Sequence, residues 1–193
     1  MHEVERFFYV AHSAIKAWGA TPAWDKVPQR LGLLSLKRHE AAAKNLILRH
    51  HIPEKFALLA PVARGKHNGK EKSWAHFNDL VKPLRDLGVE PIVFPSQREE
   101  ELARQACPDA MILPPTTLGN YAALVRRAQL VIANDSGVGH IAAAVGVKQS
   151  TLIGVTDPTR TSPWNPDAVG LGKEGQWPTV DEVVAAMKKA LSA

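Results

Sequence analysis

Cysteine is nearly absent from the 193-residue sequence, and long apolar runs are missing altogether. The single cysteine, Cys107, excludes an internal disulfide framework and a zinc site built from several cysteines. No window of about 18 uninterrupted apolar residues could span a bilayer, and the start MHEVERFF lacks the basic stretch and apolar run of a secretory signal. The fold must depend on packing, for which a hydrophobic content of 45% is sufficient. These absences predict a cytoplasmic protein.

Acidic residues are in the minority, 19 against 24 lysines and arginines, which leaves a net charge of +5. A net positive charge favours anionic partners such as nucleic acid, an anionic lipid surface or a phosphorylated small molecule. The basic residues are scattered except in RGKHNGKEK at 64–72, and the sequence contains neither a zinc finger nor an aromatic-studded binding sheet. We therefore expect no nucleic-acid partner.

From residue 56 onward, apolar runs typical of strands alternate with helical patterns, which predicts an α/β fold with a doubly wound, Rossmann-like parallel sheet. Strands are expected at 56–60, 91–94, 110–113, 130–133 and 150–155, and helices at 74–87, 99–106, 118–128 and 137–145. Pro83 should kink or divide the first of these helices. A last helix begins at TVDE, where Thr179 and Glu182 have the spacing of a capping box. In such a sheet the carboxyl ends of the strands open on one edge, where ligands bind.

The first 50 residues differ in character, so we divide the chain into a helical segment at 1–50 and the Rossmann-like domain at 51–193. A second helical run lies near 38–50, after a connector with proline and tryptophan. An apolar stripe at helical spacing consists of Val4, Phe7, Phe8, Ala11, Ile15 and Trp18. Such a stripe usually packs on its own domain, and the alternative is that it faces a domain outside this chain.

The stretch ANDSGVGHIAAAVG at 133–146 places Asp135, Ser136, Gly137, Gly139 and His140 at a strand-to-helix corner. Glycines let a ligand approach the backbone closely, and the unpaired N–H groups of a first helical turn suit a diphosphate. Ser136 and His140 are four residues apart and share a helix face, so His140 could donate to a phosphate or leaving-group oxygen. A helical histidine bonded to backbone or water is the alternative.

The role of Asp135 needs a separate argument, because a carboxylate beside phosphates repels them. It could accept hydrogen bonds from sugar hydroxyls, or from the N–H groups of its own turn. The sequence holds no Asp-x-Asp pair placed to hold a divalent ion between phosphates. We therefore expect a site that uses neither a metal nor another cofactor.

Other candidates follow neighbouring strands. Lys72 closes the loop after the first strand, where its ammonium could reach a diphosphate. Glu99 opens the helix after the second strand, the usual place for an acid that binds ribose hydroxyls. The alternatives are a solvated surface lysine and an acid that complements a helix dipole. Thr156 and Arg160 are weaker candidates, since TDPTRTSP could equally be a plain turn.

Two familiar phosphate motifs are missing. GVGHIA is not the G-x-G-x-x-G that follows a first strand, and no G-x-x-x-x-G-K-[ST] occurs, which disfavours NAD binding and P-loop hydrolysis. The predicted phosphate site lies late in the domain, a pattern typical of sugar-nucleotide transferases.

The sequence resembles the ADP-heptose lipopolysaccharide heptosyltransferases in KSW, SQREEELA, LPPTTLGNYAALVRRAQLVIANDSGVGHIAAAVG and TLIGVTDPT. The resemblance runs from HEVERF to the final helix and implies the C-terminal, donor-binding half of a GT-B glycosyltransferase. It implies inverting transfer of heptose from ADP-heptose to the lipopolysaccharide inner core, and it is compatible with peripheral association at the inner face of the inner membrane. The donor-contacting positions implied are Lys72, Glu99, Asp135, Ser136, Gly137 and His140, with Thr116 on the adenine side and Lys72 and His140 as the catalytic candidates.

The sequence also departs from that family. Ser136 stands where threonine is common, Gly139 replaces a small side chain, Ala75 stands where proline is usual, and the loop at 64–71 is longer and more basic. Nothing corresponds to the family's other half, which binds the acceptor and provides the acidic general base. We therefore expect a chain that binds the donor but does not transfer the sugar alone; the alternative is a stand-alone nucleotide-sugar binding module.

Overall fold

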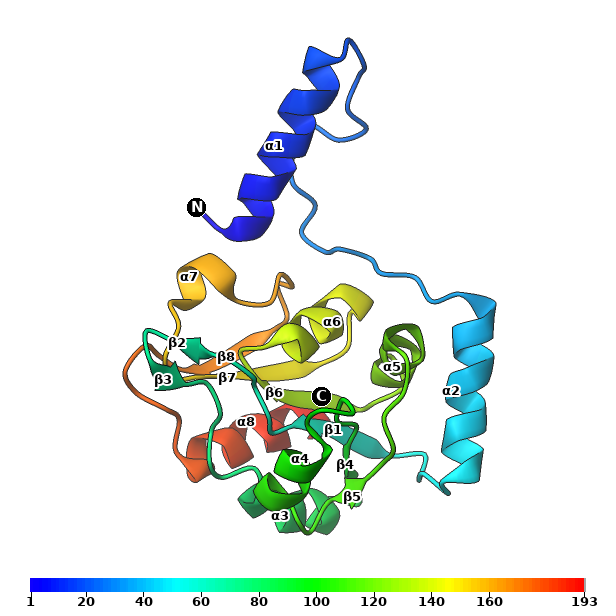
Figure 1. Ribbon diagram of the computed structural model, residues 1–193. Helices are drawn as coiled ribbons and strands as arrows, with labels where there is room; N and C mark the ends of the chain where they lie inside the picture. The colour runs from blue at the N-terminus through cyan, green and yellow to red at the C-terminus, as the bar shows by residue number, and fades with distance from the viewer. Residues whose placement is uncertain (193) are drawn as a thin grey trace.

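A six-stranded parallel sheet forms the centre of the computed structural model, which describes residues 1–192 (Figure 1). The strands are β1 (Phe56–Ala60), β4 (Glu90–Val93), β5 (Met111–Ile112), β6 (Leu130–Asn134), β7 (Gln149–Ile153) and β8 (Val169–Gly172). Their order is β5-β4-β1-β6-β7-β8, and every neighbouring pair is parallel. The predicted doubly wound α/β sheet is confirmed, with its five predicted strands correct to within one or two residues.

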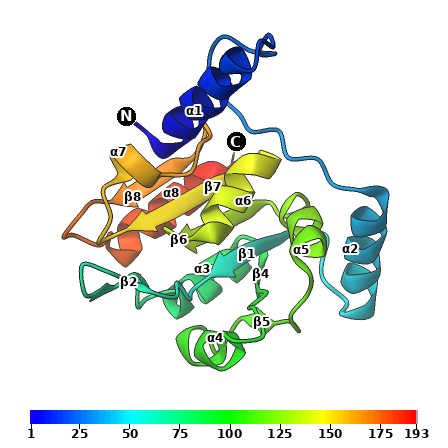
Figure 2. The same cartoon turned by 45° about the horizontal axis from the view of Figure 1, so that its top comes forward.

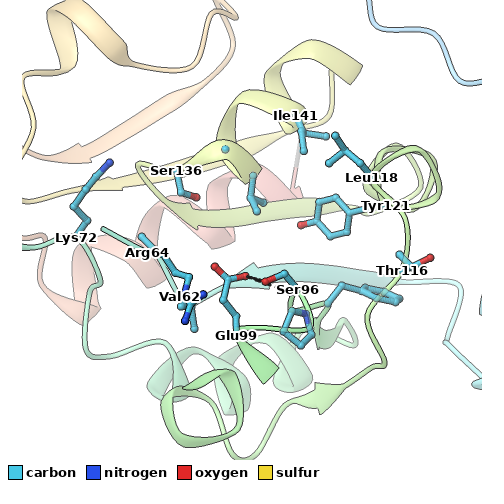
Figure 3. A pocket seen from close by; sticks show the side chains of 15 residues that line it. Val62, Arg64, Lys72, Ser96, Glu99, Thr116, Leu118, Tyr121, Ser136 and Ile141 are labelled. Atoms are coloured by element: carbon cyan, nitrogen blue, oxygen red, sulfur yellow. Dashed lines mark hydrogen bonds between the residues drawn. The ribbon is translucent and has the colours of Figure 1, made fainter. Parts of the chain in front are cut away.

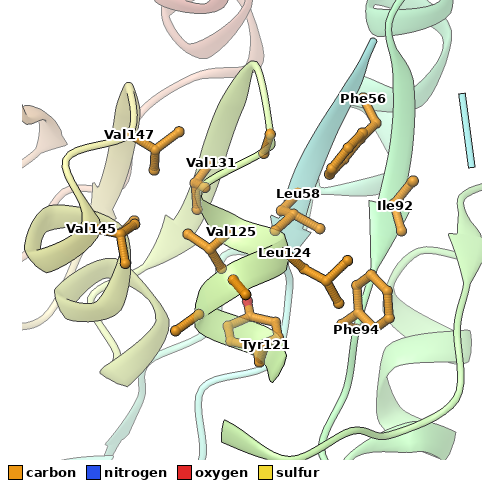
Figure 4. Close-up of a cluster of buried hydrophobic side chains, with 14 of the residues drawn as sticks. Phe56, Leu58, Ile92, Phe94, Tyr121, Leu124, Val125, Val131, Val145 and Val147 are labelled. Carbon is orange, nitrogen blue, oxygen red and sulfur yellow. The ribbon is translucent and has the colours of Figure 1, made fainter. Parts of the chain in front are cut away.

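Helices cover both faces of the sheet, as Figure 2 shows. Successive side chains of a strand point to opposite faces, so Phe56 and Leu58 belong to one core whereas Ala57 and Leu59 belong to the other. The first core, drawn in Figure 4, lies under α2 (Lys37–Arg49), α5 (Leu118–Val125) and α6 (Gly137–Val145). The second lies under α3 (Val81–Asp86), α4 (Glu100–Ala106) and α8 (Val180–Ser192).

Local signals explain where several helices begin and end. Thr179 and Glu182 exchange hydrogen bonds before α8, which confirms the predicted capping box. The helix predicted at 74–87 is shorter, because a 3₁₀ turn, η1 (Asn78–Leu80), precedes α3. The predicted helix is thus divided, as one of our two alternatives for Pro83 had it, and Pro83 lies in the first turn of α3, where a missing N–H costs no intrahelical bond.

Two strand pairings were not predicted. β8 is a largely exposed edge strand with two glycines and no clear apolar alternation. β2 (Lys66–His67) and β3 (Lys70–Glu71) form a short hairpin within the basic stretch. Its two-residue turn has positive φ at both positions, 50° at Asn68 and 76° at Gly69, as a tight hairpin connection requires.

The apolar stripe of α1 (Glu3–Ala17) does not pack on its own domain, so the first of our two alternatives is wrong. No residue of α1 is buried, and Phe7 is 70% exposed. The helix projects from the rest of the molecule, and near its start Glu3 pairs with Arg160 at 3.2 Å, beside the short helix α7 (Pro158–Thr161) (Figures 1 and 2). α2 instead packs against α5, through the buried Ala43. The division of the chain at residue 50 stays a prediction.

Candidate functional site

The sheet has its switch point between β1 and β6, where the strand order reverses. Loops after β1, β4, β5 and β6 surround a first cavity of about 540 Å³ (Figure 3). A second cavity of about 470 Å³ lies over the ends of β6 and β7. Lys72, Ser136 and Gly137 line both. The two cavities therefore adjoin at the start of α6.

The first cavity has apolar walls and a few polar groups. Phe94, Leu118 and Ile141 are among its apolar lining residues. Its polar lining residues are Arg64, Lys72, Ser96, Glu99, Thr116, Tyr121 and Ser136. A flat aromatic group fits such walls, and the polar groups can fix its orientation.

The two glycines of the 133–146 corner have different roles. A Cβ added to Gly137 would meet no atom within 4 Å, so this position opens on the cavities. A Cβ at Gly139 would lie 3.2 Å from Pro163 and 3.5 Å from Thr151. Gly139 thus allows close packing inside the protein, and our expectation that it admits a ligand is wrong. Of these two glycines, Gly137 is the one that lines the cavities.

Ser136 precedes the first turn of α6, and its side chain does not cap the helix. The hydroxyl oxygen is enclosed and has no hydrogen-bond partner among residues 1–192. Buried hydroxyls normally have a partner. With the free N–H groups of the first turn of α6, this group can bind an anion.

The carboxylate of Asp135, only 7% exposed, accepts a hydrogen bond of 2.6 Å from the Thr156 hydroxyl. Among the hydrogen bonds of residues 1–192, none runs from an N–H group of its own turn to this carboxylate. Both residues line the second cavity, together with His67, His140 and Arg160. Desolvation by surrounding protein lowers the pKa of His140, and the nearby Asp135 charge opposes this effect. The imidazole is therefore neutral at pH 7.

Lys72 and Glu99 reach the first cavity from different loops (Figure 3). The half-buried Lys72 makes no ion pair with any residue in the range 1–192. Glu99 accepts hydrogen bonds from the Ser96 hydroxyl at 2.5 Å and from the Ser96 N–H at 3.3 Å. These bonds hold its carboxylate at the cavity. Glu99 also directly precedes α4, which is the position that the alternative, an acid complementing the helix dipole, requires.

All seven predicted site residues line one or both cavities. Glu99 and Thr116 belong to the first, Asp135 and His140 to the second, and Lys72, Ser136 and Gly137 to both. Thr156 and Arg160, the weaker candidates, line the second. Their roles in binding stay predictions. Within residues 1–192, no three His, Cys, Asp or Glu side chains are grouped as a metal site requires, and independence from metal also stays a prediction.

Sequence reasoning missed Asn134, which is fully buried at the end of β6. Its Oδ1 accepts the Trp74 N–H at 2.9 Å, and its Nδ2 donates to the carbonyl oxygens of Ala60 at 3.2 Å and Pro61 at 2.9 Å. The side chain thus ties the loop that carries Lys72 to the corner at Asp135. An amide residue directly before that acid was the available signal.

Tyr121 was also missed, because it occupies an ordinary apolar position in the α5 pattern. Its hydroxyl reaches into the first cavity (Figure 3). Arg64 and His67 were noticed only as part of a basic stretch, but the β2–β3 hairpin and its base bring each to a cavity.

Comparison with known proteins gives one consistent result. The profile of glycosyltransferase family 9 (heptosyltransferase) matches residues 1–190. Lipooligosaccharide heptosyltransferase 2 of Haemophilus influenzae is 33% identical over 110 residues, which are 51% of this chain and 32% of that protein. Lipopolysaccharide heptosyltransferase 3 of Escherichia coli is 28% identical over 143 residues, 68% of this chain and 41% of that protein.

Solved structures agree on the fold. The structure of E. coli ADP-heptose lps heptosyltransferase II matches with a TM-score of 0.67 at 20% identity, covering 90% of this chain and 59% of that one. The likeness confirms the Rossmann-like half of a GT-B fold. The chain spans less than half the length of the curated relatives it matches.

Proposed function

Because the chain belongs to glycosyltransferase family 9, the heptosyltransferase family, we propose that it is the donor-binding half of an inverting heptosyltransferase. In this proposal ADP-heptose spans the two cavities, with the nucleoside in the first and the sugar in the second. The observation that carries it is the shared lining by Lys72, Ser136 and Gly137. A diphosphate is the part of such a donor that joins nucleoside to sugar, and these residues stand at that junction.

The nucleoside half is supported by the composition of the first cavity. The adenine ring lies between apolar walls that include Leu118 and Ile141, with Thr116 at its side. The Glu99 carboxylate, oriented by Ser96, accepts from ribose hydroxyls. Burial of the ring supplies most of the favourable free energy, and the polar groups supply orientation.

The diphosphate half requires positive charge. The Lys72 ammonium has no competing carboxylate partner among the described residues, so it is available to the phosphates. The first turn of α6 adds N–H groups and its dipole, and the open space at Gly137 lets the phosphate approach. These groups take the role that a divalent cation has in other transferases.

The reaction follows from this placement. An acceptor hydroxyl attacks the anomeric carbon as the bond to the β-phosphate oxygen breaks, and the departing ADP carries new negative charge. Lys72 offsets that charge and the neutral His140 can donate a hydrogen bond to it. Asp135 and Thr156 orient the sugar hydroxyls.

Inversion needs a general base on the face of the sugar opposite the leaving group. The candidate groups of both cavities lie on the donor side. We propose that the base and the contacts to the lipopolysaccharide core acceptor come from polypeptide outside these 193 residues. We propose that transfer to that acceptor takes place in the cytoplasm, with the protein in peripheral contact with the inner face of the inner membrane. In the described part of the chain, no helix has both the length and the apolarity to cross a membrane.

Calorimetric titration with ADP tests the donor site directly. Lys72→Ala should weaken ADP binding about 10- to 100-fold, because a charge-assisted hydrogen bond contributes about 1.5–3 kcal/mol. His140→Ala should weaken it less, because the imidazole is neutral. Lys70→Ala is the matched control, since Lys70 is exposed on β3 and lines neither cavity. Equal effects of Lys72→Ala and Lys70→Ala would contradict the proposal.

A further inference from the structure

Tyr121 differs from the other core residues of α5 in carrying a polar atom. Its side chain is 8% exposed and belongs to the core under α5 and α6. The ring meets Phe94 edge to face, with centroids 6.4 Å apart and an interplanar angle of 77°. These contacts fix the ring, so the direction of the hydroxyl is fixed as well.

The hydroxyl leaves the core and points into the first cavity, on the side that faces Ser96 and Glu99 (Figure 3). Over residues 1–192 it makes no hydrogen bond, and protein atoms do not enclose it. The ring is buried, but its oxygen opens on the cavity, where water or a ligand can pair with it. Phenylalanine would fill the same core volume, so packing alone does not account for the oxygen.

Burial and the nearby Glu99 charge both raise the pKa of Tyr121, so the group remains protonated throughout the neutral range. It is therefore a fixed donor that also accepts. The neighbouring carboxylate of Glu99 can only accept when ionised. The two groups differ in what they can recognise on one ligand.

We propose that the Tyr121 hydroxyl is a specificity-determining group that hydrogen-bonds a polar atom of the donor's nucleoside, on the ribose or on the edge of the base. This inference rests on the proposed nucleotide site. The tyrosine ring forms part of the cavity wall and its oxygen selects among ligands that fit the same apolar slot. Ligands without a nucleoside are not affected by it.

The test compares Tyr121→Phe with the unmodified chain in calorimetric titrations. The variant should bind ADP about three- to tenfold more weakly, the loss expected for one neutral hydrogen bond. Binding of inorganic pyrophosphate, which has no nucleoside, should be unchanged. The loss should disappear with 2′-deoxy-ADP if the partner is the ribose 2′-hydroxyl, and with purine riboside diphosphate, which has no 6-amino group, if it is the adenine amino group.

Tyr9→Phe is the matched control, because Tyr9 is the only other tyrosine and is 51% exposed on α1. With ¹³C-labelled tyrosine, two ring signals are expected, and ADP should shift that of Tyr121 alone. Thermal unfolding of Tyr121→Phe should match the unmodified chain, since the ring remains. If ADP binds both chains equally, the role of Tyr121 is refuted while the nucleotide site stands. Failure of ADP to bind the unmodified chain would overturn both proposals.

Discussion

Replacing Asn134 with alanine tests the connection between the end of β6 and the loops that shape the first cavity. The side chain is fully buried and makes three hydrogen bonds, all to backbone groups of Trp74, Ala60 and Pro61. Truncation leaves these groups without that partner in a place that excludes bulk water. A buried group left unpaired costs about 1–3 kcal/mol.

Taking the lower figure for each of the three groups, Asn134→Ala should reduce the free energy of unfolding by about 3 kcal/mol. For a chain of this size, such a loss lowers Tm by about 6–12 °C. The variant should still fold, because domains commonly have 5–15 kcal/mol of stability. ADP affinity measured below the transition should fall too, since the Trp74 N–H anchors the segment that carries Lys72.

The assay is urea unfolding followed by circular dichroism, with Asn78→Ala as the control. Asn78 also makes two side-chain hydrogen bonds, to Asp109 at 2.8 and 3.1 Å, but at the surface. Water replaces its lost partners, so that variant should lose less than about 1 kcal/mol. If the two variants are destabilised equally, burial of the Asn134 network does not stabilise the site as argued.

Three further predictions concern glycines and His140. Gly154→Ala should destabilise the protein by about 1–3 kcal/mol, because the new Cβ would lie 2.0 Å from the Trp177 ring; unchanged urea unfolding would show that the ring moves freely. Gly137→Ala should keep its stability but lose ADP affinity, whereas Gly139→Ala should lose stability but keep ADP affinity. Thermal unfolding measures the first property and calorimetric titration the second. Because burial lowers the pKa of His140 below 6.5 in the folded chain, the unfolded chain binds the proton first as pH falls. The stability that the neutral imidazole contributes is therefore present above pH 6.5 and is lost as pH falls through the lowered pKa. His140→Gln should therefore lose less stability than the unmodified chain between pH 7.5 and 5.5 in urea titrations, and identical losses would contradict the lowered pKa.

Much of the candidate site could be predicted because many of its residues lie in the loops that follow apolar runs. Lys72, Glu99 and Asp135 follow β1, β4 and β6, and parallel strands bring such positions to one edge. Asn134 and Tyr121 could not be found in this way. An asparagine at a strand end and a tyrosine in a helix are common, and only their surroundings show that one ties two loops together and the other opens on a cavity.

The apolar stripe of α1 is a second case in which the sequence pattern was not sufficient. Periodicity identified the helix correctly, but it does not say which surface an apolar face meets, and Phe7 remains exposed. Likewise, the sequence alone does not distinguish the roles of Gly137 and Gly139. Their different roles depend on Pro163 and Thr151, which approach one of them from distant parts of the chain.

The sequence by itself determined the alternation of strands and helices, the parallel sheet and the set of loops that carry polar groups, because these depend on local periodicity and on the geometry of crossover connections. Only the tertiary structure decided that two cavities adjoin at Lys72, Ser136 and Gly137, and which hydroxyls lack a partner within the described chain. The physical reason is that hydrogen bonding and close contact act over a few ångströms between residues many positions apart, and no local pattern records those distances.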